Sequence, residues 1–159
     1  MTSRIFLCFL ILLAAVFPSS TPSTAPGGKN ATIAPRSVSQ ASQESQVERG
    51  RYLVEEVAKC GECHSPRDAN GELDHSRWLQ GAPIWIVPVH HDPSWAERAP
   101  GLAGFPSYTE AQGEKILEQG VGPNGIALRR PMHTYHLKHE DAVAIMAYLK
   151  TLTPGMSPQ

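Results

Sequence analysis

Two cysteines and a histidine, Cys60, Cys63 and His64, form a C-x-x-C-H motif in a chain of 159 residues. This spacing is the attachment signature of c-type haem. Thiols three positions apart lie on one helical turn, so each can add to one of the two vinyl groups of the ring. The adjacent imidazole is then presented to the iron. The motif predicts one covalent haem c, held by Cys60 and Cys63, with His64 as an axial ligand.

The first residues are typical of a secretory signal. Arg4 supplies a positive charge, and an unbroken apolar run of 13 residues follows at positions 5–17. This run is shorter than the about 20 residues of an ordinary membrane span. We expect a signal peptide over residues 1–20, with its end between 19 and 25, and therefore a periplasmic protein. An uncleaved segment would instead leave the protein tethered to the membrane.

The cysteine count changes if the signal is removed. Cys8 lies inside the apolar run, so the mature chain keeps only the two thiols of the motif. Two thiols allow no further disulfide framework and are too few for a cysteine-rich zinc site. A thiol redox or zinc module without haem is a further hypothesis, but no βαβ pattern supports a thioredoxin-like fold.

Composition divides the rest of the chain. Residues 21–45 are rich in Ser, Thr, Ala and Pro. Such a segment buries too little apolar surface to order itself, so we expect a disordered linker. Residues 46–154 are predicted to form one domain, followed by a tail at 155–159. The formal net charge is −1, and this balance does not suggest a nucleic-acid partner.

Three helical segments are predicted in the domain, with long Gly- and Pro-rich loops between them. The first, residues 47–59, leads into the motif. The second, residues 110–119, has Thr109 as N-cap and Gly120 as a stop signal. The third, residues 140–152, carries acidic residues in its first turn. We predict an all-α fold in which the loops wrap a prosthetic group.

The second axial ligand is sought among the methionines and the remaining histidines. Met132 follows Pro131 in the loop before the last helix, where a stiffened loop can hold a thioether toward the iron, and we predict it as the ligand. Six-coordinate iron has no open position for a substrate, which favours electron transfer over catalysis. A five-coordinate haem enzyme or sensor domain, peroxidase-like or gas-binding, is one alternative. A bis-histidine site is the other, through a loop histidine among His90, His91, His133, His136 and His139.

With these motifs together, the chain resembles the monohaem class I c-type cytochromes over residues 50–152. The resemblance rests on the C-x-x-C-H motif with its preceding helix, on the methionine loop P-M-H-T-Y at 131–135, and on the last helix. The sequence S-P-R-D at 65–68 is similar to cytochrome c subunits of periplasmic alcohol and aldehyde dehydrogenases. The resemblance implies the class I cytochrome c fold, with three to four helices and long loops around one covalent haem.

The resemblance also implies roles for further residues. The sequence A-P-G-L-A-G around Pro100 and Leu102 is similar to a family segment whose proline carbonyl accepts a hydrogen bond from the axial histidine. Pro100 would have that role, with Pro83 or Pro88 as alternatives, and Leu102 would pack on the haem. A close crossing of the first and last helices at Gly50 is also implied.

The function implied by the resemblance is that of a periplasmic electron carrier and not of an enzyme. It would shuttle single electrons between a dehydrogenase or respiratory complex and an acceptor such as an oxidase, so its partners would be redox proteins. A membrane would be involved only through an uncleaved N-terminal anchor. Arg129 and Arg130 depart from the small or proline residues common before the methionine loop. They either contact a haem propionate or a partner protein, or are solvated.

Overall fold

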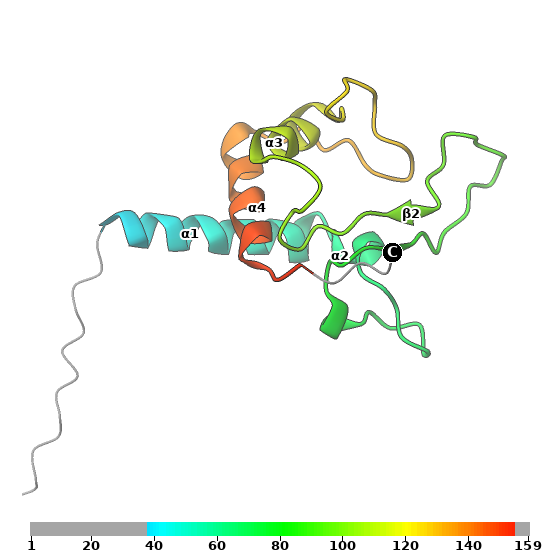
Figure 1. The fold of residues 1–159 in the computed structure, drawn as a ribbon, viewed down its shortest axis with the longest axis horizontal. Helices are drawn as coiled ribbons and strands as arrows, with labels where there is room; N and C mark the ends of the chain where they lie inside the picture. Colours follow the sequence, from blue (N-terminus) through cyan, green and yellow to red (C-terminus); the bar gives the residue numbers. More distant parts are fainter. Residues whose placement is uncertain (1–37, 155–159) are drawn as a thin grey trace, which may run out of the picture. The chain divides into compact units, whose positions relative to one another are not determined.

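Four α-helices joined by long loops make up residues 38–154, the part of the chain that the computed structural model describes (Figure 1). The predicted signal peptide, Cys8, residues 21–37 of the predicted linker and the tail lie outside it. The α-helices are α1 (Val38–Tyr52), α2 (Gly61–His64), α3 (Glu110–Gln119) and α4 (His139–Thr151). The predicted helical fold is confirmed, and no helix within residues 38–154 is long and apolar enough to cross a membrane.

Helix α1 begins at Val38, nine residues before the predicted start, so residues 38–45 are helical and not part of a disordered segment. No proline or glycine interrupts the chain from Val38 to Arg49, and Ala, Gln and Glu are good helix formers. The α-helix then changes into the π-helical turn η1 (Leu53–Val57). Lys59, which we expected to be helical, has a left-handed φ of 50° and redirects the backbone into the motif.

Helices α1 and α4 cross at Gly50 (Figure 1). A Cβ atom at this position would lie 1.9 Å from the carbonyl oxygen of Ala144 and 2.9 Å from Cβ of Tyr148. Only a residue without a side chain allows this approach, so the close crossing implied by the resemblance is present. The crossing contributes to one buried core formed by Leu53, Val54, Leu79, Ala103, Leu117, Ala142, Ile145, Met146, Tyr148 and Leu149.

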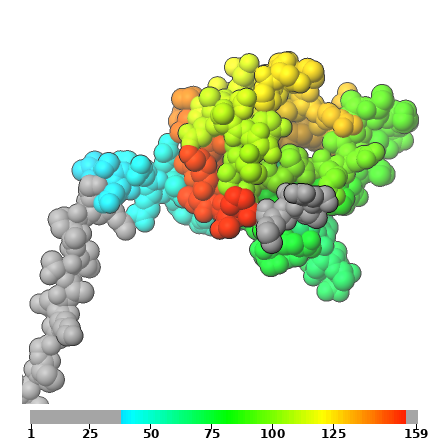
Figure 2. All heavy atoms as spheres, viewed as in Figure 1, coloured from blue at the N-terminus to red at the C-terminus, as the bar shows by residue number. Residues whose placement is uncertain are grey.

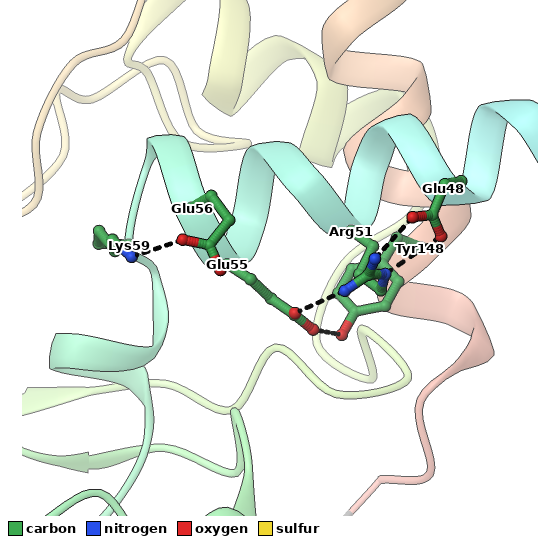
Figure 3. A network of polar contacts seen from close by, with 6 residues as sticks. All are labelled: Glu48, Arg51, Glu55, Glu56, Lys59 and Tyr148. Carbon is green, nitrogen blue, oxygen red and sulfur yellow. Dashed lines mark hydrogen bonds and ion pairs between the residues drawn. The ribbon is translucent and has the colours of Figure 1, made fainter.

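A polar network lies beside this crossing (Figure 3). The Tyr148 hydroxyl donates to the Glu55 carboxylate at 2.5 Å. The Arg51 guanidinium donates to the Glu48 carboxylate at 2.6 Å and to the Glu55 carboxylate at 3.2 Å. Burial, followed by the Glu55 contact, raises the pKa of Tyr148 to about 12. The ion pairs lie on the exposed side of α1 and contribute little to stability, whereas the tyrosine ties α4 to the turn that precedes the motif.

The remaining elements are short. Strands β1 (Ala82–Pro83) and β2 (Arg98–Ala99) form an antiparallel pair, and η2 (His75–Arg77) is a single 3-10 turn. Helix α3 has the predicted bounds, with a capping box at Thr109 and a left-handed Gly120 after its end. The loops between these elements therefore carry much of the domain, and they position the candidate site.

Candidate haem-binding site

The C-x-x-C-H motif forms one helical turn, with Cys60 as the N-cap of α2 and His64 as its last residue. The His64 amide donates to the Cys60 carbonyl at 2.9 Å. Both thiols are free, and burial raises the pKa of Cys60 to about 11. The two thiols and the imidazole that covalent haem attachment requires therefore come from one short element.

Trp78 packs on this turn where Gly61 has no side chain. A Cβ atom at Gly61 would lie 2.2 Å from the indole ring of Trp78. The indole also stacks on the ring of His75, with 5.5 Å between the ring centroids. Gly61 is thus a packing requirement of the turn, so a larger residue at this variable position of the motif would displace the tryptophan.

The chain that leaves the motif is fixed by Ser65, whose role the sequence did not indicate. Its side chain is buried, and its Oγ accepts a hydrogen bond from the Leu79 amide at 2.8 Å. The carbonyl of His64 also accepts from the amide of Gly81 at 2.7 Å. These contacts hold the C-terminal end of the turn against the loop before β1.

The His64 ring is buried, at 7% exposure, and its Nδ1 lies 2.8 Å from the carbonyl oxygen of Pro100. A carbonyl oxygen only accepts, so the contact assigns the proton to Nδ1 and leaves Nε2 with a lone pair for a metal. Burial lowers the pKa of His64, against the opposing effect of the Pro100 contact. A neutral imidazole is the form that binds iron. Pro100 therefore makes the contact that the resemblance implies.

Leu102 lies close to this contact in sequence. Its amide donates to the carbonyl of Leu79 at 2.7 Å, and its half-buried side chain packs against the core cluster. This position is compatible with an apolar wall near His64. The packing of Leu102 on haem stays a prediction.

Met132 is half-buried at the end of a turn, where its amide donates to the carbonyl of Arg129 at 3.1 Å. Three residues later, the Tyr135 hydroxyl donates to the carbonyl of Ala58 at 3.1 Å. Ala58 lies just before Cys60, so the methionine loop is tied to the entry of the motif. Burial, followed by the two nearby cysteines, raises the pKa of Tyr135 to about 12. The role of Met132 as ligand stays a prediction.

The alternative histidine ligands occupy exposed positions. His139 lies 2.8 Å from Glu118, and the His133 ring packs edge-on against Tyr135.

The two arginines before the methionine loop contact the backbone and side chains of the loop 84–97. Arg129 donates to the carbonyl oxygens of Trp95 and Ser94, at 2.5 and 3.3 Å. Arg130 pairs with Asp92 at 3.4 Å. From the sequence we expected these arginines to contact a haem propionate or a partner protein, or to be solvated. Contacts with the loop 84–97 were not predicted, because these partners lie more than thirty residues away in the sequence.

The residues present fit a c-type haem. Two free thiols and a buried imidazole lie on one turn, the imidazole has its Nδ1 satisfied, and a methionine-bearing turn belongs to a loop tied to the same region. This donor set suits iron in a covalently held porphyrin. It gives the site the groups for one-electron chemistry at the metal.

The cytochrome c family model matches residues 47–153. The chain therefore belongs to the cytochrome c family, whose members are electron carriers with covalently bound haem c.

Two curated relatives are similar over the domain. A protein named diheme cytochrome c-type, from Cereibacter sphaeroides, is 41% identical over 115 residues, which cover 66% of this chain and 35% of the relative. The fructose dehydrogenase cytochrome subunit of Gluconobacter japonicus is 33% identical over 116 residues, which cover 65% of this chain and 21% of the relative. The chain spans about a third and about a fifth of their lengths. The predicted similarity to dehydrogenase cytochrome subunits is confirmed.

Proposed function

We propose that this chain carries one haem c, attached through Cys60 and Cys63 and ligated by His64 and Met132, and that it transfers single electrons without acting on a bound substrate. The observation that supports the proposal most strongly is the buried His64 ring, which follows the two thiols in the sequence. Its Nδ1 contacts the Pro100 carbonyl, so its Nε2 is available to bind iron. A contact of this kind fixes the orientation of a ligand and raises its basicity. The sequence contains one C-x-x-C-H motif, which supports one haem.

Each residue of the site has a distinct task. The bound haem supplies a one-electron couple of its iron. Cys60 and Cys63 prevent the group from dissociating, and His64 provides a strong nitrogen donor. The Met132 thioether is a weaker donor that favours ferrous iron, so it raises the reduction potential relative to two histidines. Iron held by both His64 and Met132 would have no coordination position left for a substrate.

We also propose export to the periplasm and electron transfer from a dehydrogenase or respiratory complex to an oxidase or another carrier. The signal-like segment 1–20 supports export, and retention of this segment would tether the protein to the membrane. The similarity to the fructose dehydrogenase cytochrome subunit supports a dehydrogenase as electron donor.

The absorption spectrum of the reduced protein, produced together with cytochrome maturation proteins, tests haem attachment. We expect sharp α and Soret bands and a haem that resists extraction with acidic organic solvent. The double variant Cys60→Ala/Cys63→Ala, as the matched control, should release any haem on extraction. A wild-type protein without these bands would contradict the proposal.

The ferric spectrum tests the sixth ligand. A weak long-wavelength charge-transfer band is expected in the wild-type protein and should disappear in Met132→Ala. Met146→Leu is the matched control and should keep the band, because Met146 on α4 is 2% exposed and belongs to the hydrophobic core. A band that persists in Met132→Ala would refute Met132, whereas a high-spin wild type that binds carbon monoxide rapidly would support the five-coordinate alternative.

A further inference from the structure

We propose that Arg129 is a positioning residue for the axial methionine. Its guanidinium anchors the turn 129–132 to a platform, residues 92–96, that continues to the Pro100 contact with His64. The inference rests on the proposed function, in which Met132 is the sixth ligand. In Figure 2 the green atoms of the loop 84–97 lie beside the yellow-orange atoms of the segment before α4, and the hydrogen bonds of Arg129 to Ser94 and Trp95 join the two segments.

The turn that carries Met132 is held at its first two residues. The Arg129 carbonyl accepts from the Met132 amide at 3.1 Å and closes the turn. The Arg129 side chain donates to two successive carbonyl oxygens of the platform, those of Ser94 and Trp95. The next residue, Arg130, accepts from the Ala96 amide through its own carbonyl at 2.6 Å. The backbone position of Met132 thus depends on these contacts with residues 94–96.

The platform has an ordered conformation of its own. The Asp92 carboxylate accepts from the amide and the hydroxyl of Ser94, at 2.8 and 2.6 Å, and the Asp92 carbonyl accepts from the Trp95 amide at 3.0 Å. The Trp95 indole donates to the carbonyl of Ile86 at 3.3 Å. These bonds orient the Ser94 and Trp95 carbonyls, so Arg129 meets acceptors that are already in place.

The chain that follows the platform contacts His64, the predicted axial histidine. The carbonyl of Glu97 accepts from the Ile84 amide at 2.8 Å, and β2 then pairs with β1 before the chain reaches Pro100. Pro100 accepts from the His64 ring. A continuous stretch of nine residues, 92–100, therefore contacts both predicted axial-ligand segments, and it fixes the methionine turn relative to the histidine.

The chemistry of the anchor requires arginine. A planar guanidinium has several donors in a fixed fork and can reach two adjacent carbonyls at once, which a lysine ammonium cannot match in geometry. Both arginine side chains are exposed, but Arg130 makes one longer contact, at 3.4 Å with the Asp92 carboxylate, whereas Arg129 reaches two backbone carbonyls. Exposed ion pairs such as that of Arg130 contribute little. Arg130 is therefore a control with the same charge in the same turn.

Competition by imidazole for the ferric iron tests the proposal, with loss of the long-wavelength band as the readout. Loosening the turn makes Met132 easier to displace, so the imidazole affinity of Arg129→Gln should rise about threefold to tenfold. Arg130→Gln should stay within about twofold of the wild type. Urea unfolding, measured in parallel, should show that both variants stay folded under the assay conditions, so that the imidazole affinities compare intact proteins.

The outcomes separate the two claims. Equal imidazole affinities for Arg129→Gln and Arg130→Gln would overturn the positioning role, even if Met132→Ala loses the band and the proposed function holds. A band that persists in Met132→Ala would overturn both claims. If Arg129→Gln does not yield holoprotein, the same comparison is made with Arg129→Lys and Arg130→Lys. Tighter imidazole binding by Arg129→Lys supports the fork geometry, and equal binding refutes it.

Discussion

Replacing Gly50 with alanine tests the helix crossing that holds the domain together. Carbon atoms pack at about 3.5–4.0 Å, whereas the new Cβ would lie 2.9 Å from Cβ of Tyr148 and 1.9 Å from the carbonyl oxygen of Ala144. The nearer atom belongs to a helix backbone, so α1 and α4 must separate. Overpacking costs about 1–3 kcal/mol and occasionally more. Contact with a helix backbone, which cannot move aside like a side chain, favours a value above that range, about 4 kcal/mol. Alanine recovers about 1 kcal/mol of helix propensity.

The net expectation for Gly50→Ala is a free energy of unfolding lowered by about 3 kcal/mol. The assay is urea unfolding of the haem-loaded protein, followed by far-ultraviolet circular dichroism. Gln43→Ala, on the exposed side of the same helix, is the control and should change stability by less than about 0.5 kcal/mol. A Gly50→Ala protein as stable as the wild type, or more stable, would show that the helix backbones do not approach at this position.

Three further substitutions test individual contacts. The pKa of Tyr148 is about 12 in the folded protein and near 10 in the unfolded chain, so the free energy of unfolding of the wild type should fall as the pH rises from about 10 to about 12. Tyr148→Phe should lose less stability over this pH range. Equal losses in the two proteins would refute the link between ionisation of Tyr148 and unfolding. Ser65→Ala leaves the buried Leu79 amide without an acceptor and should cost about 1–3 kcal/mol in urea unfolding; a cost within about 0.5 kcal/mol would contradict this. Tyr135→Phe removes the hydrogen bond to the Ala58 carbonyl before the motif and should lower the free energy of unfolding by about 1 kcal/mol. A midpoint of urea unfolding identical to that of the wild type would contradict this.

Local signals in the sequence predicted the regular elements that depend on them. Helix α3 has the expected bounds because its capping box at Thr109 and its left-handed Gly120 act within a few residues. The motif turn follows equally from its spacing. The start of α1 was missed because residues 38–45 are exposed and mostly polar, and they show no apolar periodicity. These residues are helical because most of them have good intrinsic helix propensity and because they extend the helix whose later turns are buried.

Long-range contacts around the site were harder to predict. The Pro100 contact with His64 spans 36 residues and was suggested by resemblance, since no spacing rule requires it. The contacts of Arg129 with Ser94 and Trp95 span 35 and 34 residues, and their acceptors are backbone carbonyls that no residue type identifies. Such contacts depend on how two loops pack, which a sequence pattern does not encode locally.

The proposed site holds one haem c with His64 and Met132 as axial ligands. Proton nuclear magnetic resonance of the reduced protein tests it most directly, because the haem ring current moves the methyl group of an axial methionine far upfield. We predict one three-proton resonance in that region, present in the wild type and in Met146→Leu and absent in Met132→Ala. Absence of this resonance from the reduced wild type, or its persistence in Met132→Ala, would contradict the proposed site.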